Sequence, residues 1–450
     1  MYQVEGTVPS LVVDVGSHTV KAGTAGEDLP HVLIPSALAC EHESEPLENE
    51  ALKKAIKSPR AGHNALAIRR DNVEIQSAFS PDGLIENWNL FETLLSHTLY
   101  NELQAPTREN ALLFGEPNHN GRKARERIVE LIFEKFEVPA LYLARSAVLS
   151  AYANGKTTGL VLDVGHSGTS AVPVEDGAVV KGKAIRTAIG GRTLNAALDT
   201  LLASANKALR PIWSYKRTIT RIDGVDEDNL MRQSQVEELP FPKTTRSFWE
   251  FSRTQLLEEV KASICVVHEN PSVDLKSLPV VHDSYELPDG NTIEMNVERF
   301  SVAEQTIFGR LPHVIMETNT DARLSYVNQF VNGSRQSTGN EKSDESIGLH
   351  GLVVDAIRRC PETIHRDMYA GVCLTGGTSD MHGLFERLSY GLQETYHKVR
   401  VLAATGSHER KYCAWTGGSI LATFSEFQKM WFSKVEYDEN GSSFVHRKCQ

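Results

Sequence analysis

Two short segments of the chain carry the same arrangement of residues, and that arrangement suits phosphate binding. Residues 11–23 read LVVDVGSHTVKAG, and residues 160–172 read LVLDVGHSGTSAV. In each, an apolar run ends on an aspartate, and a turn with glycine two residues later leads into a second β-prone run. Consecutive backbone N–H groups in such a turn form a concave anion site, and glycine lets the backbone approach a phosphate closely. An aspartate at each strand end can hold Mg²⁺ through water, since this ion keeps several of its waters.

A third glycine turn lies further along the chain. Thr375-Gly376-Gly377-Thr378 follows the apolar run 372–374. Leu384, Leu388 and Leu392 then recur at i, i+4 and i+8, which predicts one buried face of a helix. Two duplicated hairpins that face each other would bind a polyphosphate from both sides, so that the ligand joins two halves of the molecule.

An ordinary turn without a ligand is the alternative for either Asp-x-Gly segment taken alone. The duplication, Lys21 beside the first turn and the third glycine turn together favour a ligand site. The sequence has no GxxxxGK[ST] stretch and no GxGxxG stretch, which argues against P-loop and Rossmann sites.

The segments around these turns predict an α/β protein. The apolar run before each turn is too short for a helix and predicts a buried strand that enters a hairpin. Residues 122–136 predict a helix with Ile128, Ile132 and Phe136 on one face and a solvated basic face at its start. Residues 319–347 are rich in Asn, Ser, Gly and charge, which predicts a long insertion or disordered loop.

Length and composition bound the class of protein. The 450 residues exceed a typical single domain, and 47 Lys+Arg against 58 Asp+Glu give a net charge of −11. This charge argues against a nucleic-acid binder, because DNA is held by a surplus of cations. No stretch has the ~18 continuous apolar residues of a membrane span, and residues 1–10 lack signal-peptide features. Six scattered cysteines without a C-x-x-C pair favour reduced thiols. We therefore expect a soluble, intracellular, multidomain protein.

With the hairpins and the third turn in view, the chain resembles the actin family. The matching stretches beyond the hairpins are GLIENW at 83–88, AVLSAYANGKTTGLVLDVG at 147–165, ERKYCAWTGGSIL at 409–421, MWFSKVEYDENG at 430–441 and VHRKC at 445–449. The resemblance covers most of the chain. It implies an actin-like α/β fold, in which duplicated ribonuclease H-like halves with four subdomains surround a central nucleotide cleft.

The resemblance also implies how the chain divides. The first half comprises a small core subdomain (1–35, 76–153 and 413–450) and an outer subdomain (36–75), whose residues 38–75 are unlike actin's polymerisation loop. The second half comprises a core subdomain (154–189 and 346–412) and an outer subdomain (190–345), which carries insertions at about 203–245 and 309–345.

By resemblance, the ligand is ATP or ADP with Mg²⁺ or Ca²⁺. The residues that match the family's phosphate loops are Gly16, Ser17, His18, Lys21, Gly165, His166, Ser167 and Gly168. Asp14 and Asp163 match the residues that hold the metal through water. The adenosine side is matched by Lys261, Gly376, Gly377, Thr378 and Lys411. Ala262 and Met381 replace a glutamate and a tyrosine there, which leaves the base preference open.

Four replacements affect the family's hydrolytic chemistry. His18 replaces a glycine, so its side chain must turn away or crowd the phosphates. His166 replaces an aspartate that organises magnesium-bound water. Ser146 and Ser170 stand where actin has the glutamine and histidine of the catalytic water network. Losing such groups typically costs ~10²–10⁴ in rate, so we expect a pseudo-ATPase with no catalytic residue. For both histidines, an ordinary surface or packed position is the alternative.

An apolar set matches the lining of actin's hydrophobic cleft, which accepts partner helices. Its members are Tyr152, Ile420, Leu421, Phe424 and Met430. Core packing is the alternative interpretation, because Ile420, Phe424 and Phe427 fall at i, i+4 and i+7.

Within the family, the chain is similar to the nuclear actin-related proteins of chromatin-remodelling and histone acetyltransferase complexes. The features are the replaced polymerisation loop, residues 244–247 with Trp249, and YELPDGN at 285–291. This implies a nuclear location, with the cytoplasm also allowed. The implied partners are an actin monomer, a long amphipathic helix of a remodeller or acetyltransferase subunit, and histones. It implies no sequence-specific nucleic acid, membrane or homopolymer. An active ATPase or kinase and a filament-forming actin are the alternatives. KKAIKSPR at 53–60 is a candidate basic targeting segment.

Overall fold

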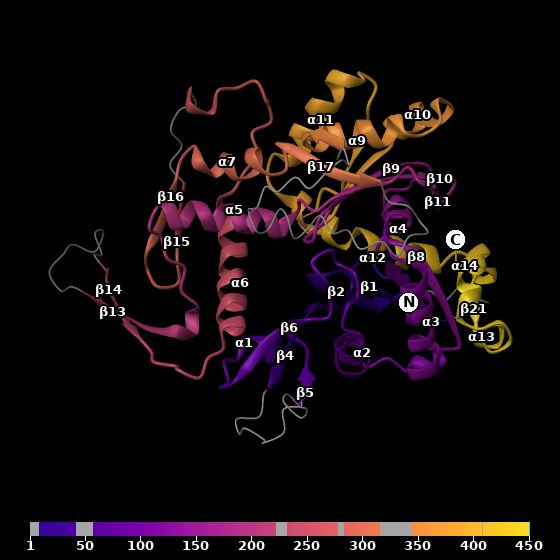
Figure 1. Ribbon diagram of the computed structural model, residues 1–450, viewed down its shortest axis with the longest axis horizontal. Helices are drawn as coiled ribbons and strands as arrows, with labels where there is room; N and C mark the ends of the chain where they lie inside the picture. The colour runs from indigo at the N-terminus through magenta and orange to yellow at the C-terminus, as the bar shows by residue number, and fades with distance from the viewer. Residues whose placement is uncertain are drawn as a thin grey trace, which may run out of the picture.

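The computed structural model describes residues 9–41, 57–221, 232–277, 283–315, 344–406 and 408–449. Within these residues, two mixed β-sheets form the body of the molecule, and helices cover them (Figure 1). Smaller sheets lie outside this body.

The first sheet has the order β21-β8-β7-β1-β2-β3. Its strands are β1 (Ser10–Val15), β2 (Thr19–Thr24), β3 (Val32–Pro35), β7 (Ala111–Glu116), β8 (Ala140–Arg145) and β21 (Phe432–Ser433). The central strand β1 pairs antiparallel with β2 and parallel with β7. Since β1 is buried along its whole length, its apolar run is continuous and does not alternate with polar residues.

The second sheet repeats this arrangement in the order β18-β17-β12-β10-β9-β19-β20, with β11 beside β10. Its strands are β9 (Gly159–Val164), β10 (Thr169–Glu175), β11 (Ala178–Val179), β12 (Ile185–Thr187), β17 (Arg310–Ile315), β18 (Asp344–Ile347), β19 (Val372–Thr375) and β20 (Val401–Leu402). Strand β9 pairs antiparallel with β10 and parallel with β19, as β1 does with β2 and β7. The predicted duplicated α/β fold is therefore confirmed.

Helices pack on both sheets and between them. The longer ones are α2 (Trp88–Ser96), α3 (Arg122–Glu130), α4 (Ser146–Ala153), α5 (Gly191–Ser204), α6 (Arg246–Ile264), α9 (Gly348–Arg358), α10 (Glu362–Tyr369), α11 (Leu384–Thr395) and α12 (Glu409–Ala422). Leu384, Leu388 and Leu392 of α11 are fully buried, as their spacing predicted.

The predicted helix at 122–136 is present, as α3 followed by a π-helical turn over Leu131–Lys135. Its face of Ile128, Ile132 and Phe136 is buried as predicted. The prediction that the basic residues at its start are solvated was wrong for Arg125, because this side chain is buried. Its guanidinium pairs with Glu116 at 2.8 Å and donates to the Cys449 carbonyl at 2.7 Å.

A small outer sheet packs against α6. It consists of β4 (Ala37–Glu41), β5 (Lys57–Arg60) and β6 (Val73–Ser77), with α1 (His63–Ala67) beside it. The Phe248 ring of α6 is fully buried among residues of this sheet and α1. Ile75 N donates to Ser247 Oγ at 3.0 Å, and the Thr245 hydroxyl donates to the Val73 carbonyl. The outer parts of the two halves therefore touch. Of the candidate targeting segment, residues 53–56 lie outside the described residues and residues 57–60 form β5.

Both predicted insertions contain strands. Within 203–245, β13 (Tyr215–Arg221) and β14 (Arg232–Glu238) form a hairpin that projects from the body (Figure 1). Between the two insertions, residues 283–305 form β15 (Asp283–Glu286), β16 (Thr292–Met295) and α7 (Glu298–Gln305). The predicted loop at 319–347 was wrong at its end, because Asp344–Ile347 form β18 and pair with β17. Its residues 319–343 lie outside the described residues.

Two further sequence observations have structural counterparts. All six cysteines are free and buried in the described chain, as expected of reduced thiols. Among the helices within the described ranges, none is long and apolar enough to cross a membrane.

Candidate functional site

A cavity of about 590 Å³ lies where the three glycine turns converge. Its walls come from the β1–β2 turn, the β9–β10 turn, the turn after β19, and helices α4, α6 and α12. The cavity brings together every residue that the sequence assigned to phosphate, metal and adenosine, namely Asp14, Gly16, Ser17, His18, Lys21, Asp163, Gly165, His166, Ser167, Gly168, Lys261, Gly376, Gly377, Thr378 and Lys411.

The two hairpins share backbone geometry as well as sequence. Gly16 N donates to the Thr19 carbonyl at 3.1 Å, and Gly165 N donates to the Gly168 carbonyl at 3.0 Å. In each turn, therefore, the N–H of the glycine donates to the carbonyl three residues later. The two matched turns, at the ends of β1 and β9, therefore line the same cavity, and the backbone of each suits an anion.

The third turn fixes the second hairpin. Gly376 has φ +93°, and a Cβ atom there would lie 2.4 Å from Asp163 Oδ1. Both the backbone conformation and the close approach therefore require glycine. The Thr378 hydroxyl donates to the Gly165 carbonyl at 3.1 Å, which ties this turn to the β9–β10 turn.

The paired aspartates fit a divalent cation. Asp14 Oδ2 accepts a hydrogen bond from Lys21 Nζ at 2.9 Å, and both side chains are nearly buried. Burial, followed by the negative charge of Asp14, raises the pKa of Asp163 to about 6. A cation near both carboxylates would favour their ionised forms, and carboxylates are the ligands that Mg²⁺ and Ca²⁺ prefer. The donor set therefore matches the ion that the family uses.

Ser146 and Ser170, which the resemblance aligns with the family's water-positioning groups, line the cavity. The Ser146 hydroxyl accepts a hydrogen bond from Asn118 Nδ2 at 3.0 Å, and Asn118 Oδ1 accepts from Ala147 N at 3.1 Å. Ser170 is buried on β10, directly opposite Asp163 on β9. A hydroxyl does not act as a base near neutral pH, so these positions supply no proton acceptor.

On the adenosine side, two lysines face the cavity. Lys261 Nζ donates to Asn195 Oδ1 at 2.6 Å, while Lys411 lies beside Gly377. Burial lowers the pKa of both lysines. Ala262 and Met381 also line the cavity. By resemblance, Ala262 replaces a glutamate, and its side chain fills less of the cavity than a glutamate would.

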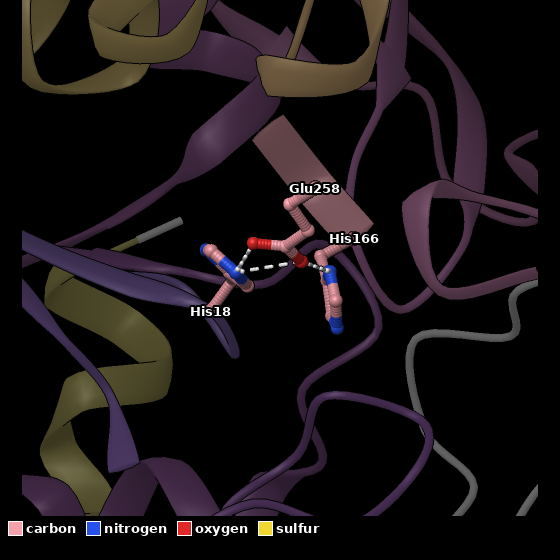
Figure 2. A group of neighbouring side chains, drawn as sticks. All are labelled: His18, His166 and Glu258. Atoms are coloured by element: carbon pink, nitrogen blue, oxygen red, sulfur yellow. Dashed lines mark hydrogen bonds and ion pairs between the residues drawn. The ribbon is translucent and has the colours of Figure 1, made fainter. Parts of the chain in front are cut away.

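Two histidines and a glutamate meet across the cavity, as Figure 2 shows. His18 Nε2 lies 3.0 Å from Glu258 Oε2, and His166 Nδ1 lies 3.9 Å from Glu258 Oε1. The two imidazole rings are 4.5 Å apart between centroids. His18 therefore turns toward α6 and His166. This is how a side chain is accommodated at the position where the family has a glycine. Neither histidine is an isolated surface residue.

The charges within this group depend on one another. Burial raises the pKa of Glu258, but the hydrogen bond and charge of His18 outweigh it and lower the pKa to about 2. Burial and the charge of His18 lower the pKa of His166 to about 3. Near neutral pH, the Glu258 carboxylate is therefore ionised and the His166 imidazole is neutral.

Sequence reasoning missed Glu258 and Asn195. Asn195 Nδ2 donates to Glu258 Oε1 at 3.0 Å and so orients the carboxylate. A signal was present for Glu258, because it precedes Lys261 by three residues and so shares its helix face. Asn195 carried no such signal, because it lies on α5 and meets α6 only through the tertiary fold.

The apolar set divides between surface and core. Ile420, Phe424 and Met430 are 36%, 43% and 44% exposed. Leu421 packs in the core, and Tyr152 of α4 is half-buried against two core clusters. Phe427 also turns inward, where its ring lies 4.9 Å from that of Tyr142. The i, i+4, i+7 spacing therefore describes two exposed side chains and one core side chain.

Comparisons with known proteins agree with this architecture. The sequence model of the family described as Actin matches residues 5–450. "Actin-related protein 4" of Arabidopsis thaliana is 35% identical over 466 residues, with 98% of each chain covered. "Actin-related protein 4" of Oryza sativa subsp. indica is 32% identical, again with 98% of each chain covered. "SWI/SNF and RSC complexes subunit arp42" of Schizosaccharomyces pombe is 29% identical, with 98% of this chain and 99% of the relative covered.

Proposed function

Because this chain belongs to the actin family, we propose that it is an ATP-binding structural subunit of a nuclear chromatin-remodelling complex. In this proposal it hydrolyses ATP very weakly or not at all. The relative named as a subunit of the SWI/SNF and RSC complexes supports the assembly. The sequence resemblance to nuclear actin-related proteins extends the proposal to a histone acetyltransferase complex and to a contact with histones.

One observation carries the proposal for the ligand. Two matched turns and two paired aspartates face one cavity, while Ser146 and Ser170 stand at its wall. Asp14 and Asp163 would hold Mg²⁺ or Ca²⁺, and the turns with Lys21 would hold the phosphates of ATP or ADP. The bound ion would neutralise phosphate charge. The chain's own residues then bind and enclose the nucleotide without activating water.

Glu116 and Glu258, the two glutamates of the cavity wall, give little support to a kinase or an active ATPase. Glu116 is fully buried and pairs with Arg125, with Arg145 at 3.4 Å. Glu258 is engaged by His18 and Asn195. A substrate base has to accept a proton from a bound hydroxyl, and these carboxylates are already held by cations or hydrogen-bond donors.

The test of the ligand proposal combines binding with turnover. Purified protein is stripped of nucleotide, and its melting temperature is measured with and without Mg-ATP, followed by phosphate release over hours. We expect stabilisation by ATP and phosphate release at the background rate. An unchanged melting curve at saturating Mg-ATP would refute the nucleotide site, and steady release would refute the structural role.

The exposed apolar residues support the proposed partner contact. Ile420, Phe424 and Met430 can accept an amphipathic helix, which anchors through residues at i, i+3, i+4 and i+7. An actin monomer beside that helix completes the proposed assembly. The chain itself is not expected to form filaments, because its 38–75 region has lost the polymerisation loop. Sedimentation of the purified protein separates this proposal from a filament-forming actin.

A further inference from the structure

We propose that His18, His166 and Glu258 form a site for Zn²⁺, separate from the magnesium site of Asp14 and Asp163. Two imidazoles and one carboxylate are nitrogen and oxygen ligands that suit zinc, whereas magnesium prefers oxygen alone. The ligand atoms of the three residues all lie within 4.8 Å of one another. His18 and His166 also lie in the turns proposed to bind phosphate, so the zinc site is defined here for the nucleotide-free protein.

The distances are close to those of a zinc site. Ligands at 2.0–2.1 Å from a tetrahedral zinc ion lie about 3.3 Å from one another. His18 Nε2 and His166 Nδ1 are 3.0 and 3.9 Å from the Glu258 carboxylate oxygens. The widest separation within the set is at most 4.8 Å, so the side chains would have to move together to reach coordinating distance.

The backbone at each histidine is fixed by neighbouring elements. The His18 carbonyl accepts from Ser36 N at 2.9 Å, and the His166 carbonyl accepts from Arg192 N at 3.0 Å. Glu258 lies on the long helix α6, whose N-terminal part packs against the outer sheet. The three ligands therefore come from the β1–β2 turn, the β9–β10 turn and α6, and Figure 2 shows them facing one another. An ion bound by all three would join both halves of the molecule.

Residues behind the three ligands orient the Glu258 carboxylate through hydrogen bonds. Asn195 Nδ2 donates to Glu258 Oε1 at 3.0 Å, and Lys261 Nζ donates to Asn195 Oδ1 at 2.6 Å. Metal-binding carboxylates are commonly held by such hydrogen bonds, and removing the partner weakens metal binding by roughly 10–100-fold. Three protein ligands leave a fourth position for water or a phosphate oxygen, which is the pattern of an open zinc site.

The experiment titrates nucleotide-free protein with Zn²⁺ alone and follows bound metal by elemental analysis. Co²⁺ then serves as a visible probe of tetrahedral coordination. We expect one tight equivalent in the wild type. His166→Asn and His18→Gln should each weaken it on the order of 100-fold or more, and Asn195→Ala roughly 10–100-fold.

His31→Gln is the matched control, because His31 also pairs with a glutamate (Glu27) but has no second histidine in that pair. Circular dichroism verifies that each variant is folded. Equal zinc affinity in wild type, His18→Gln and His166→Asn would overturn the proposal. So would a cobalt spectrum with thiolate charge-transfer bands, which would place the ion on a cysteine, or an equal loss in His31→Gln.

Discussion

Asp163 is a cavity carboxylate whose ionised form is disfavoured in the ligand-free protein. Its pKa lies at about 6 against an ordinary value of 3.8, so its ionised form destabilises the ligand-free protein. Each pKa unit corresponds to about 1.4 kcal/mol. Asp163→Asn should therefore stabilise the nucleotide-free protein near pH 7, by up to about 3 kcal/mol.

The same variant should lose its response to Mg-ATP, because the amide no longer offers a negative oxygen to the cation. Wild type at about 1,000 Kd of ligand gains on the order of 4 kcal/mol. Thermal melts with and without Mg-ATP measure both effects. Asp176→Asn is the control, since this exposed residue lies at the far end of the same hairpin. An Asp163→Asn protein that still responds like the wild type would place the cation elsewhere.

His119 predicts a pH dependence. Burial, then the positive charge of Arg186, lowers its pKa well below the usual 6.5. The unfolded chain thus takes up a proton below pH 6.5 while the folded chain does not, so stability falls as the pH falls through 6.5. Below pH 6.5, the free energy of unfolding should fall by about 1 kcal/mol less per pH unit in His119→Gln than in the wild type. Urea unfolding at pH 7.0, 6.0 and 5.5 measures it, and parallel curves for wild type and variant would contradict the assignment.

At the scale of elements, α6 contacts the outer sheet near its N-terminal end and lines the cavity further along, through Glu258, Lys261 and Ala262. Ser247 Oγ accepts a hydrogen bond from Ile75 N across this contact. A hydrogen bond of this kind contributes about 1 kcal/mol. Ser247→Ala should therefore speed the release of a fluorescent ATP analogue roughly fivefold in stopped-flow measurements.

Ser252→Ala is the matched control, because Ser252 lies on the same helix and bonds to Phe248 and Trp213 within the same half. Release from that variant should equal the wild-type rate. If both variants release nucleotide at the wild-type rate, the outer contact does not limit exchange.

The sequence predicted those elements whose pattern is local. The strands before Asp14 and Asp163 and the buried leucine face of α11 are visible in residue spacing alone. The strand β18 was missed, because Asp-Glu-Ser-Ile has little β-propensity and forms a strand only by pairing with β17. The triad of His18, His166 and Glu258 was missed as a group, because its members meet only when three distant elements fold together.

At the scale of the whole molecule, the exposed residues proposed for partner docking are different from those that line the cavity proposed for the nucleotide. Ile420, Phe424 and Met430 are exposed near the end of α12, whereas the cavity is lined from the inner side of this helix by Lys411 and Ala414. Changes at one surface should therefore leave the other intact. Docking of a helix should depend on a few central apolar anchors.

Phe424→Asp tests this separation, because it places a charge where a partner would exclude water. Truncating a central anchor typically costs about 2 kcal/mol or more, and the charge adds to that cost. Pull-down with actin and an amphipathic remodeller helix should fail, while Mg-ATP stabilisation stays at the wild-type value. Val435→Asp, at another exposed apolar position, is the control. A folded Phe424→Asp protein that retains its partners would show that docking occurs elsewhere.

The cavity is proposed to hold ATP as a structural ligand without hydrolysing it. The most direct measurement loads the stripped protein with one equivalent of γ-labelled Mg-ATP, removes free nucleotide, and follows the chemical state of the bound nucleotide over a day. Asp14→Ala is the control for binding through the first hairpin. We predict that the wild type retains stoichiometric label as intact ATP and that Asp14→Ala retains almost none. Release of one equivalent of labelled phosphate from the wild type, with ADP left in the cavity, would contradict the claim.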